Sequence, residues 1–263
     1  MNGVVALRET VDKLGGRAGA ALAALFTAVG VATVVAQQTV IAASRRITAA
    51  QETPDSQFVV DPATIETPLS LDLSFGVAVL VVLGVAVIAE YAAVVTLRVV
   101  TGDSLAAAAA TRRVGRTVVV GFLVGTVVRV LVGVGLAAFL LPGVFFAVTL
   151  LFAHPAVAID DAGVREALAT AWSLASGRWL DVAAIVSLLV VLYLTPRLVG
   201  SVVTGAPGLL LGGAVTGIGS LLSSGVVGRA YLAAKEEESR EQTAAEADPY
   251  DAPLDADDLA EPE

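Results

Sequence analysis

The feature that most constrains this chain is a set of long apolar blocks almost free of charge. Residues 118–159 form 42 consecutive positions with one charged side chain, Arg129. As a single helix this block would be about 63 Å long, about twice the hydrocarbon thickness of a bilayer. It must therefore fold back, and Leu141-Pro142-Gly143 is the only helix-breaking sequence near its middle. The block predicts two membrane-spanning helices joined by a sharp turn.

A membrane-spanning helix needs about 20 mostly apolar residues, and six segments of the chain meet this requirement. The predicted spans are residues 19–43, 73–99, 118–141, 144–159, 182–203 and 207–232. The fourth is short, so it either packs between neighbouring spans or re-enters the side from which it came. The apolar core of the first span is longer than that of a signal peptide, which favours an uncleaved span. We expect an all-α fold, a polytopic membrane helical bundle of about six transmembrane helices in a lipid bilayer.

Polar segments precede, separate and follow these spans. Residues 1–18 are amphipathic, which suits either a helix on the inner membrane surface or a helical lead-in to the first span. Residues 44–72 form a proline-containing loop between the first two spans. Residues 234–263 form an acidic tail. Positions 235–263 hold 12 acids and two bases, a net charge of −10, whereas the whole chain has a net charge of −9. With few large apolar residues, this tail is predicted to be disordered.

The segment 163–180 is predicted to be an amphipathic helix at the membrane interface. Its apolar residues recur every three or four positions and include both tryptophans of the chain, Trp172 and Trp179. Tryptophan favours the headgroup level of a bilayer, so we interpret both as interfacial anchors. Gly177 is expected to end the helix, and Asp160 or Asp161 to cap its start.

The distribution of basic residues predicts the orientation, because cytoplasmic segments are enriched in Lys and Arg. With the N-terminus inside, 12 bases fall in inside segments and three in outside segments. The three outside bases are Arg45, Arg46 and Arg197. This bias predicts a multi-pass protein of the cell membrane with both termini cytoplasmic.

Three ionisable residues lie within predicted spans, where a charge is costly and marks a candidate functional site. They are Glu90, Arg129 and His154. From the span ends, Glu90 and Arg129 lie at similar depths on consecutive antiparallel helices, so we predict that they pair. The pair either locks the second and third spans together or forms, with His154 as the titrating member, a proton or ion relay.

Glycines at GxxxG spacing occur at positions 121 and 125, 208 and 212, and 213 and 217. Such spacing allows close helix contact in lipid, and we expect packing within the chain rather than dimerisation. Cysteine is absent, so disulfides and thiol chemistry are excluded. One histidine excludes a His-rich metal site, no catalytic sequence motif is present, and no basic patch suggests nucleic-acid binding. We expect no enzymatic activity, no cofactor and no bound metal.

Residues 141–179, together with the six-span layout, resemble the membrane domain attached to some glycerophosphoryl diester phosphodiesterases and the stand-alone relatives of that domain. The matching positions are Leu141, Pro142, Gly143, Pro155, Asp160, Asp161, Ala167, Leu168, Trp172, Leu174 and Gly177. The chain departs from the pattern at Ala171, where that family usually has serine. The resemblance implies a fold and no reaction, since the phosphodiesterase barrel has no counterpart here. The excess of arginine over lysine, 14 to two, is similar to the residue usage of salt-loving archaea.

Two hypotheses for function follow. The first is a non-enzymatic membrane protein with an organising or accessory role, such as regulating envelope lipids or a complex with a membrane-protein partner. The second is a small transporter or channel that uses Glu90, Arg129 and His154. The substrate, the partner and the oligomeric state have no signature in the sequence.

Overall fold

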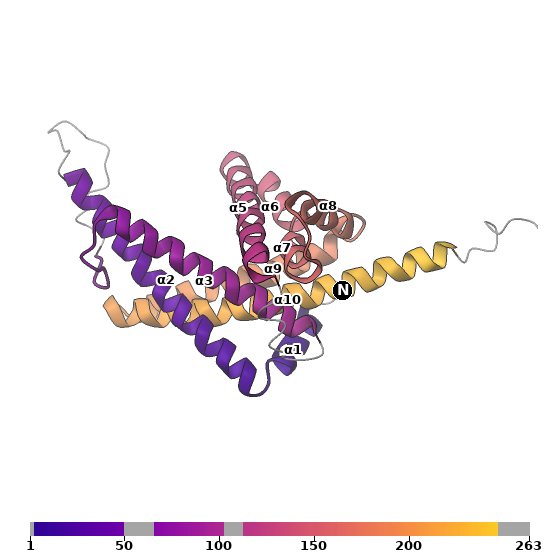
Figure 1. The fold of residues 1–263 in the computed structure, drawn as a ribbon, viewed down its shortest axis with the longest axis horizontal. Coiled ribbons are helices and arrows are strands. Elements are labelled where there is room, and N and C mark those ends of the chain that lie inside the picture. Colours follow the sequence, from indigo (N-terminus) through magenta and orange to yellow (C-terminus); the bar gives the residue numbers. More distant parts are fainter. Residues whose placement is uncertain (1–2, 50–65, 103–112, 247–263) are drawn as a thin grey trace, which may run out of the picture.

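The computed structural model describes residues 3–49, 66–102 and 113–246, and every regular element within these ranges is an α-helix. Figure 1 shows their arrangement. The helices are α1 (Gly3–Lys13), α2 (Arg17–Ala49), α3 (Phe75–Thr101), α5 (Val114–Ala138), α6 (Leu140–Thr149), α7 (Ala153–Asp160), α8 (Val164–Ala175), α9 (Trp179–Val202) and α10 (Gly205–Glu246). The predicted all-α helical bundle is confirmed.

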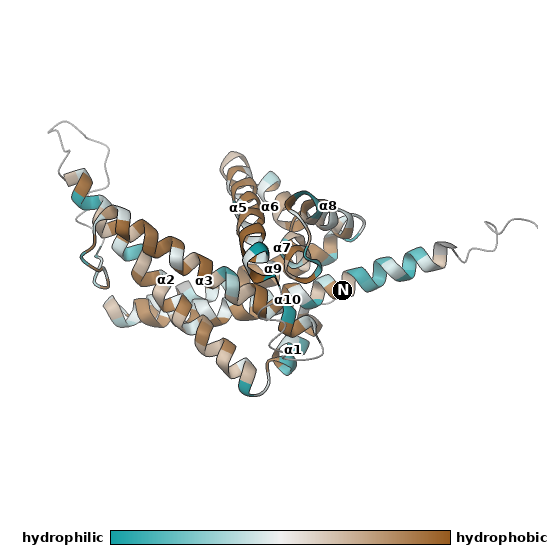
Figure 2. Ribbon diagram, viewed as in Figure 1, coloured by the Kyte–Doolittle hydropathy of each residue, from teal (hydrophilic) through white to brown (hydrophobic). Residues whose placement is uncertain are grey.

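Six helical segments are long and apolar enough to cross a membrane, as the sequence predicts. They are Arg17–Ala49, Phe75–Thr101, Val114–Ala138, Leu140–Asp160, Trp179–Val202 and Gly205–Ala244. Apolar residues cover α2, α3, α5 and α6, whereas the C-terminal part of α10 is hydrophilic (Figure 2). The molecule is therefore a multi-pass membrane protein. The predicted loop 44–72 starts too early, because α2 continues to Ala49, and much of its remainder, residues 50–65, lies outside the described residues.

The turn between the third and fourth spans lies two residues before its predicted position. α5 ends at Ala138, and the extended backbone of Phe139 (φ −158°, ψ 148°) reverses the chain. Leu141-Pro142-Gly143 then falls within the first turn of α6. Proline is tolerated there because the first backbone N–H groups of a helix have no partner inside it. The tripeptide therefore begins the returning helix rather than forming the turn.

The fourth span is two short helices, and the second of them packs at the centre of the bundle. The helix is interrupted at Leu150–Phe152, directly before the first turn of α7, which contains Pro155. α7 contacts α3, α5, α8 and α10, and Val157 is 1% exposed. Fully buried side chains around it include Phe152, Ile185 and Tyr231. The short fourth span thus packs between its neighbours and forms the core.

Backbone-to-backbone contact joins α2 to α10 at three glycines. A Cβ added at Gly213 would lie 3.0 Å from the carbonyl oxygen of Gly30. A Cβ at Gly217 would overlap the backbone of Phe26, and one at Gly30 would overlap the backbone of α10. The expectation that the Gly213/Gly217 pair packs within the chain is confirmed. α10 crosses α2 here at a distance that only glycine allows.

The polar ends of the chain are more structured than predicted. α1 packs against α10, where Thr10 is fully buried beside Gly225 and Glu9 forms a 2.5 Å ion pair with Arg229. α1 therefore belongs to the bundle and is more than a lead-in to α2. The prediction of disorder from residue 234 is wrong for residues 234–246, because α10 continues to Glu246. Residues 247–263 lie outside the described residues.

The predicted interfacial helix 163–180 is shorter and is capped differently. α8 ends at Ala175, and Gly177 follows with φ +84°, in agreement with its expected role as a helix end. The cap prediction is wrong: Gly163 precedes the helix and its N–H donates to Glu166 Oε2 at 3.2 Å. Asp161 instead ends α7 in the left-handed conformation.

Candidate functional site

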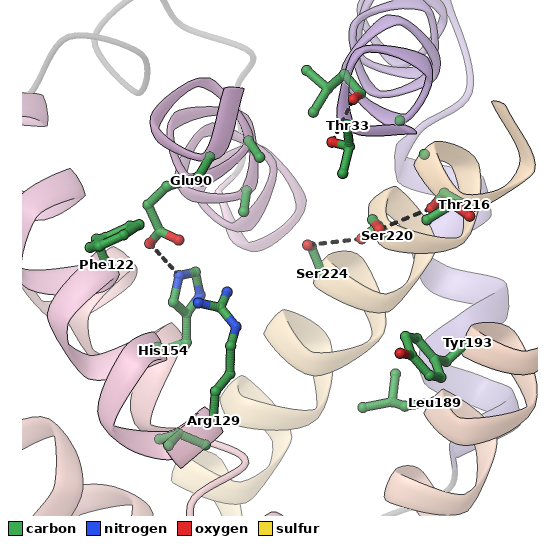
Figure 3. Close-up of a pocket in the computed structure, with 18 of the residues that line it drawn as sticks. Thr33, Glu90, Phe122, Arg129, His154, Leu189, Tyr193, Thr216, Ser220 and Ser224 are labelled. Carbon is green, nitrogen blue, oxygen red and sulfur yellow. Dashed lines mark hydrogen bonds and ion pairs between the residues drawn. The ribbon is translucent and has the colours of Figure 1, made fainter. Parts of the chain in front are cut away.

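All six spans contribute residues to a cavity of about 910 Å³. Its walls are mostly apolar, with Val82 and Val85 from α3, Val128 and Val132 from α5, and Leu189 from α9 among them. The remaining lining residues include the three ionisable residues that the sequence singles out, and these lie in α3, α5 and α7 (Figure 3). A cavity of this size and character is typical of small-molecule binding sites.

Glu90 and His154 form the one direct contact within this group of three. Glu90 Oε1 lies 2.5 Å from His154 Nε2, and the Glu90 side chain is only 7% exposed. His154 is held in place because α7, which carries it, packs against α3, α5, α8 and α10. At this distance the carboxylate and the imidazole are within hydrogen-bond reach of each other.

Gly121 of α5 gives the Glu90 carboxylate its position. A Cβ added at Gly121 would overlap Glu90 Oε1 and would lie 3.6 Å from His154 Nε2. Because glycine has no side chain, position 121 leaves the space that the Glu90 carboxylate and the His154 ring occupy. The sequence contains this signal only as half of a GxxxG pattern, which does not identify the residue it faces.

The predicted ion pair between Glu90 and Arg129 is wrong. Arg129 lies eight positions after Gly121 on α5, about 12 Å further along the helix axis. The depth estimate fails because α3 and α5 extend past the predicted span ends at residues 99 and 118 by different amounts. Glu90 is 11 residues before the end of α3, about 16 Å, and Arg129 is 15 residues after the start of α5, about 22 Å.

Arg129 nevertheless shares the cavity with Glu90 and His154. Side chains on a helix lean toward its N-terminus, and that of Arg129 reaches back over Gly125, with Nη1 3.5 Å from a Cβ added there. Figure 3 shows its guanidinium pointing toward the ring of His154. Among the described residues Arg129 has no hydrogen-bond or ion-pair partner, and it is exposed to the cavity.

α10 supplies a row of hydroxyl groups on the opposite wall, which the sequence analysis did not identify. Thr216, Ser220 and Ser224 follow one another every four residues and line the cavity (Figure 3). Each donates its hydroxyl hydrogen to the carbonyl four residues earlier, at 2.7–2.9 Å. Their oxygen lone pairs remain as acceptors. A polar four-residue repeat within an otherwise apolar span was the available signal.

The two glutamines of the first span have separate roles. Gln37 lines the cavity, together with Thr33. Gln38 accepts a 3.0 Å hydrogen bond from the backbone N–H of Leu69, which fastens the segment before α3 onto α2. Only Gln37 therefore belongs to the candidate site.

At one end of the bundle, the acidic pair at the end of α7 is held by bases from three helices. Asp161 accepts a 3.1 Å hydrogen bond from Arg98 of α3, whose side chain is 7% exposed. Arg116 of α5 donates to the Asp161 carbonyl at 2.8 Å. Asp160 binds Tyr231 and, at 2.9 Å, Lys235 of α10. The pair has a structural role that the sequence analysis did not assign to it.

The two tryptophans lie outside the cavity. Trp172 of α8 is 51% exposed and packs edge-on against Phe145 of α6, with ring centroids 5.7 Å apart. Trp179 begins α9 and is 44% exposed. They are therefore on different helices rather than on one stripe, and their role as interfacial anchors stays a prediction.

The arrangement supports proton exchange, anion binding and hydrogen bonding. Glu90 and His154 can share or pass a proton, Arg129 offers five N–H donors and a permanent charge, and the α10 hydroxyls accept hydrogen bonds. Within residues 3–49, 66–102 and 113–246, no group of three or more His, Cys, Asp or Glu side chains is placed to hold a metal ion.

Comparisons with protein-family models, curated proteins and solved structures find no match for this chain. The resemblance of residues 141–179 to the membrane domain of the phosphodiesterase type therefore stays a prediction.

Proposed function

We propose that this protein is a small transporter or channel that binds its solute in the cavity between the six spans. The observation that carries the proposal is the grouping of Glu90, His154 and Arg129 on the wall of one intramembrane cavity. Ionisable side chains are costly within a bilayer and usually mark a pathway for a solute or a proton. A purely structural ion pair would need no cavity of about 910 Å³ beside it.

The proposed location is the cell membrane, with both termini in the cytoplasm. Three of the basic residues assigned to the inside, Arg98, Arg178 and Lys235, lie at one end of the bundle, where they bind acidic residues of other segments. This clustering supports the orientation derived from the counts of Lys and Arg.

The test of transport uses the absence of cysteine, which makes every introduced thiol unique. Ser224→Cys places a thiol in the cavity, and Leu80→Cys, at a site 67% exposed on the apolar outer surface, is the matched control. Thiols react as thiolates, which need water. We expect a membrane-impermeant thiol reagent to modify Ser224→Cys from either face of sealed vesicles and to leave Leu80→Cys unmodified. No reaction at position 224 from either face would contradict transport.

The orientation has its own test with the same reagent on intact cells. Asp72→Cys, at a side chain 93% exposed, should react on intact cells. Gln242→Cys, on the exposed end of α10, should react only after the membrane is permeabilised. The reverse pattern would overturn the proposed orientation.

The accessory role is the second candidate, and the extension of α10 supports it. Residues 235–246 continue the helix, and the acidic side chains of Glu236 and Glu241 are exposed, in a form that a partner could bind. Ending the chain after Lys235 keeps the Asp160 contact and removes this surface. If the accessory role is correct, a stable partner isolated with the full-length protein should be lost with the shortened one.

A further inference from the structure

The chemistry of the cavity is uneven, and this unevenness bears on what it binds. Charged groups gather near His154 and hydroxyl groups line α10, whereas the lining residues Val82, Val85 and Ala86 of α3 and Val128 and Val132 of α5 are apolar. One part of the cavity therefore suits a polar group, and the other part suits hydrocarbon.

Arg129 is the group in this cavity whose hydrogen-bonding needs are unmet by the described residues. Glu90 is already in contact with His154 and packs against Gly121, and it makes no ion pair with the guanidinium of Arg129 among the described residues. A guanidinium is permanently charged and carries five donors. Within a membrane, donors without acceptors are strongly unfavourable. An anionic oxygen-rich group is the complementary ligand, because it accepts two parallel hydrogen bonds from arginine.

The apolar walls connect this polar end with the surface that faces lipid. α3 and α5 lie close where Arg98 meets Thr117, at 3.1 Å, and they diverge from that end (Figure 1). Beside the cavity, Val87 of α3 is 48% exposed and Val130 of α5 is 56% exposed. A hydrocarbon chain between the two helices would cover apolar side chains of both.

We propose that the ligand of the cavity is a membrane lipid with an anionic phosphate headgroup. Arg129 binds the phosphate, the α10 hydroxyls at Ser220 and Ser224 face the rest of the headgroup, and one acyl chain lies between α3 and α5. The inference rests on the proposed transport function and names its substrate class. It differs from transport of a water-soluble ion, for which the apolar wall of α3 and α5 would have no use.

The test is photolabelling of the purified full-length protein in phosphatidylcholine vesicles. The probe is phosphatidylglycerol with a photoactivatable group in one acyl chain, and the comparison probe is diacylglycerol with the same chain and no phosphate. Labelled peptides are located by mass spectrometry. Arg129→Gln removes the cation, and Arg8→Gln, an exposed arginine of α1 outside the cavity, is the matched control.

We expect the phosphatidylglycerol probe to label the cavity-facing residues of α3 and α5. Loss of a charge-assisted hydrogen-bonded contact should lower this labelling about tenfold or more in Arg129→Gln and for the diacylglycerol probe. Arg8→Gln should label as the unsubstituted protein does. A folded Arg129→Lys variant should recover part of the labelling because it restores the positive charge.

Three outcomes would overturn the lipid assignment. Equal labelling of Arg129→Gln and unsubstituted protein would show that Arg129 does not bind the headgroup. Labelling confined to the outer surface would show that the lipid does not enter the cavity. Protection of the cavity by inorganic phosphate in the buffer would assign the site to a water-soluble anion. Transport stands in each case if Ser224→Cys still reacts from both faces, and it fails together with the lipid assignment only if that thiol is unreactive.

Discussion

The carboxylate of Glu90 occupies the space that a side chain at position 121 would fill. Gly121 lies on α5, Glu90 on α3, and His154 of α7 completes the contact with a 2.5 Å hydrogen bond. Residues of three different helices thus meet at one polar group inside the membrane. The site depends on an absent side chain as much as on the ionisable ones.

Replacing Gly121 by valine should displace Glu90 and break its bond to His154. We expect the free energy of unfolding to fall by about 1–3 kcal/mol, because overpacking and the loss of a buried hydrogen bond act together. Gly133→Val is the matched control on the same helix, where an added Cβ meets no atom within 4 Å. Denaturant unfolding in detergent micelles measures both. Equal stabilities of the two variants would show that Glu90 is not held against α5.

Double-mutant cycles should separate the observed pair from the one that the sequence predicts. The Glu90→Ala and His154→Ala substitutions should couple by about 1.5–3 kcal/mol, as expected for a hydrogen bond to a charged group. Glu90 and Arg129 make no direct contact, so the coupling free energy between Glu90→Ala and Arg129→Ala should be less than about 0.5 kcal/mol. A larger coupling for the second cycle than for the first would contradict the geometry. Unfolding in detergent provides the four free energies of each cycle.

Asp161→Asn should destabilise the end of the bundle where Arg98 is buried. The ion pair between the two residues is 3.1 Å long, the Arg98 side chain is 7% exposed, and the substitution removes the carboxylate charge from this contact. Breaking a fully buried pair costs roughly 3–5 kcal/mol. The Asp161 side chain is 16% exposed, so we expect about 2–3 kcal/mol.

Asp72→Asn is the control for this prediction. Asp72 also pairs with an arginine, Arg46, but its side chain is 93% exposed. Exposed ion pairs contribute little to stability, so the thermal unfolding midpoint should stay unchanged. A similar loss of stability in both variants would mean that burial does not distinguish the two ion pairs.

Gly217→Leu should prevent α10 from packing on α2. A side chain at this position meets the backbone of Phe26, which cannot move aside as a flexible side chain could. We expect a loss of at least about 3 kcal/mol, near the upper end for overpacking. Gly84→Leu is the matched control, because an added Cβ at Gly84 of α3 meets open space. Size-exclusion chromatography in detergent should show a single folded species only for the control.

The number and type of the spans could be predicted from local sequence. The residues at which the helices begin and end were predicted less accurately. Every predicted span has a counterpart in the structure, because the number of consecutive apolar residues is a property of the sequence itself. The turn before α6 was displaced because proline is compatible with the first turn of a helix as well as with a break. α10 continued beyond its predicted end because Arg178 binds Glu241 and so holds the acidic segment against the bundle.

The sequence alone determined that this chain is a bundle of about six membrane-spanning helices, and it identified Glu90, Arg129 and His154 as the costly residues within them. Only the tertiary structure decided that Glu90 binds His154, that Gly121 makes room for the pair, and that α10 adds its hydroxyls to the same cavity. The reason is physical. The length and hydropathy of a span are set by consecutive residues, whereas which residues face each other depends on how deep and how rotated each helix lies against its neighbours.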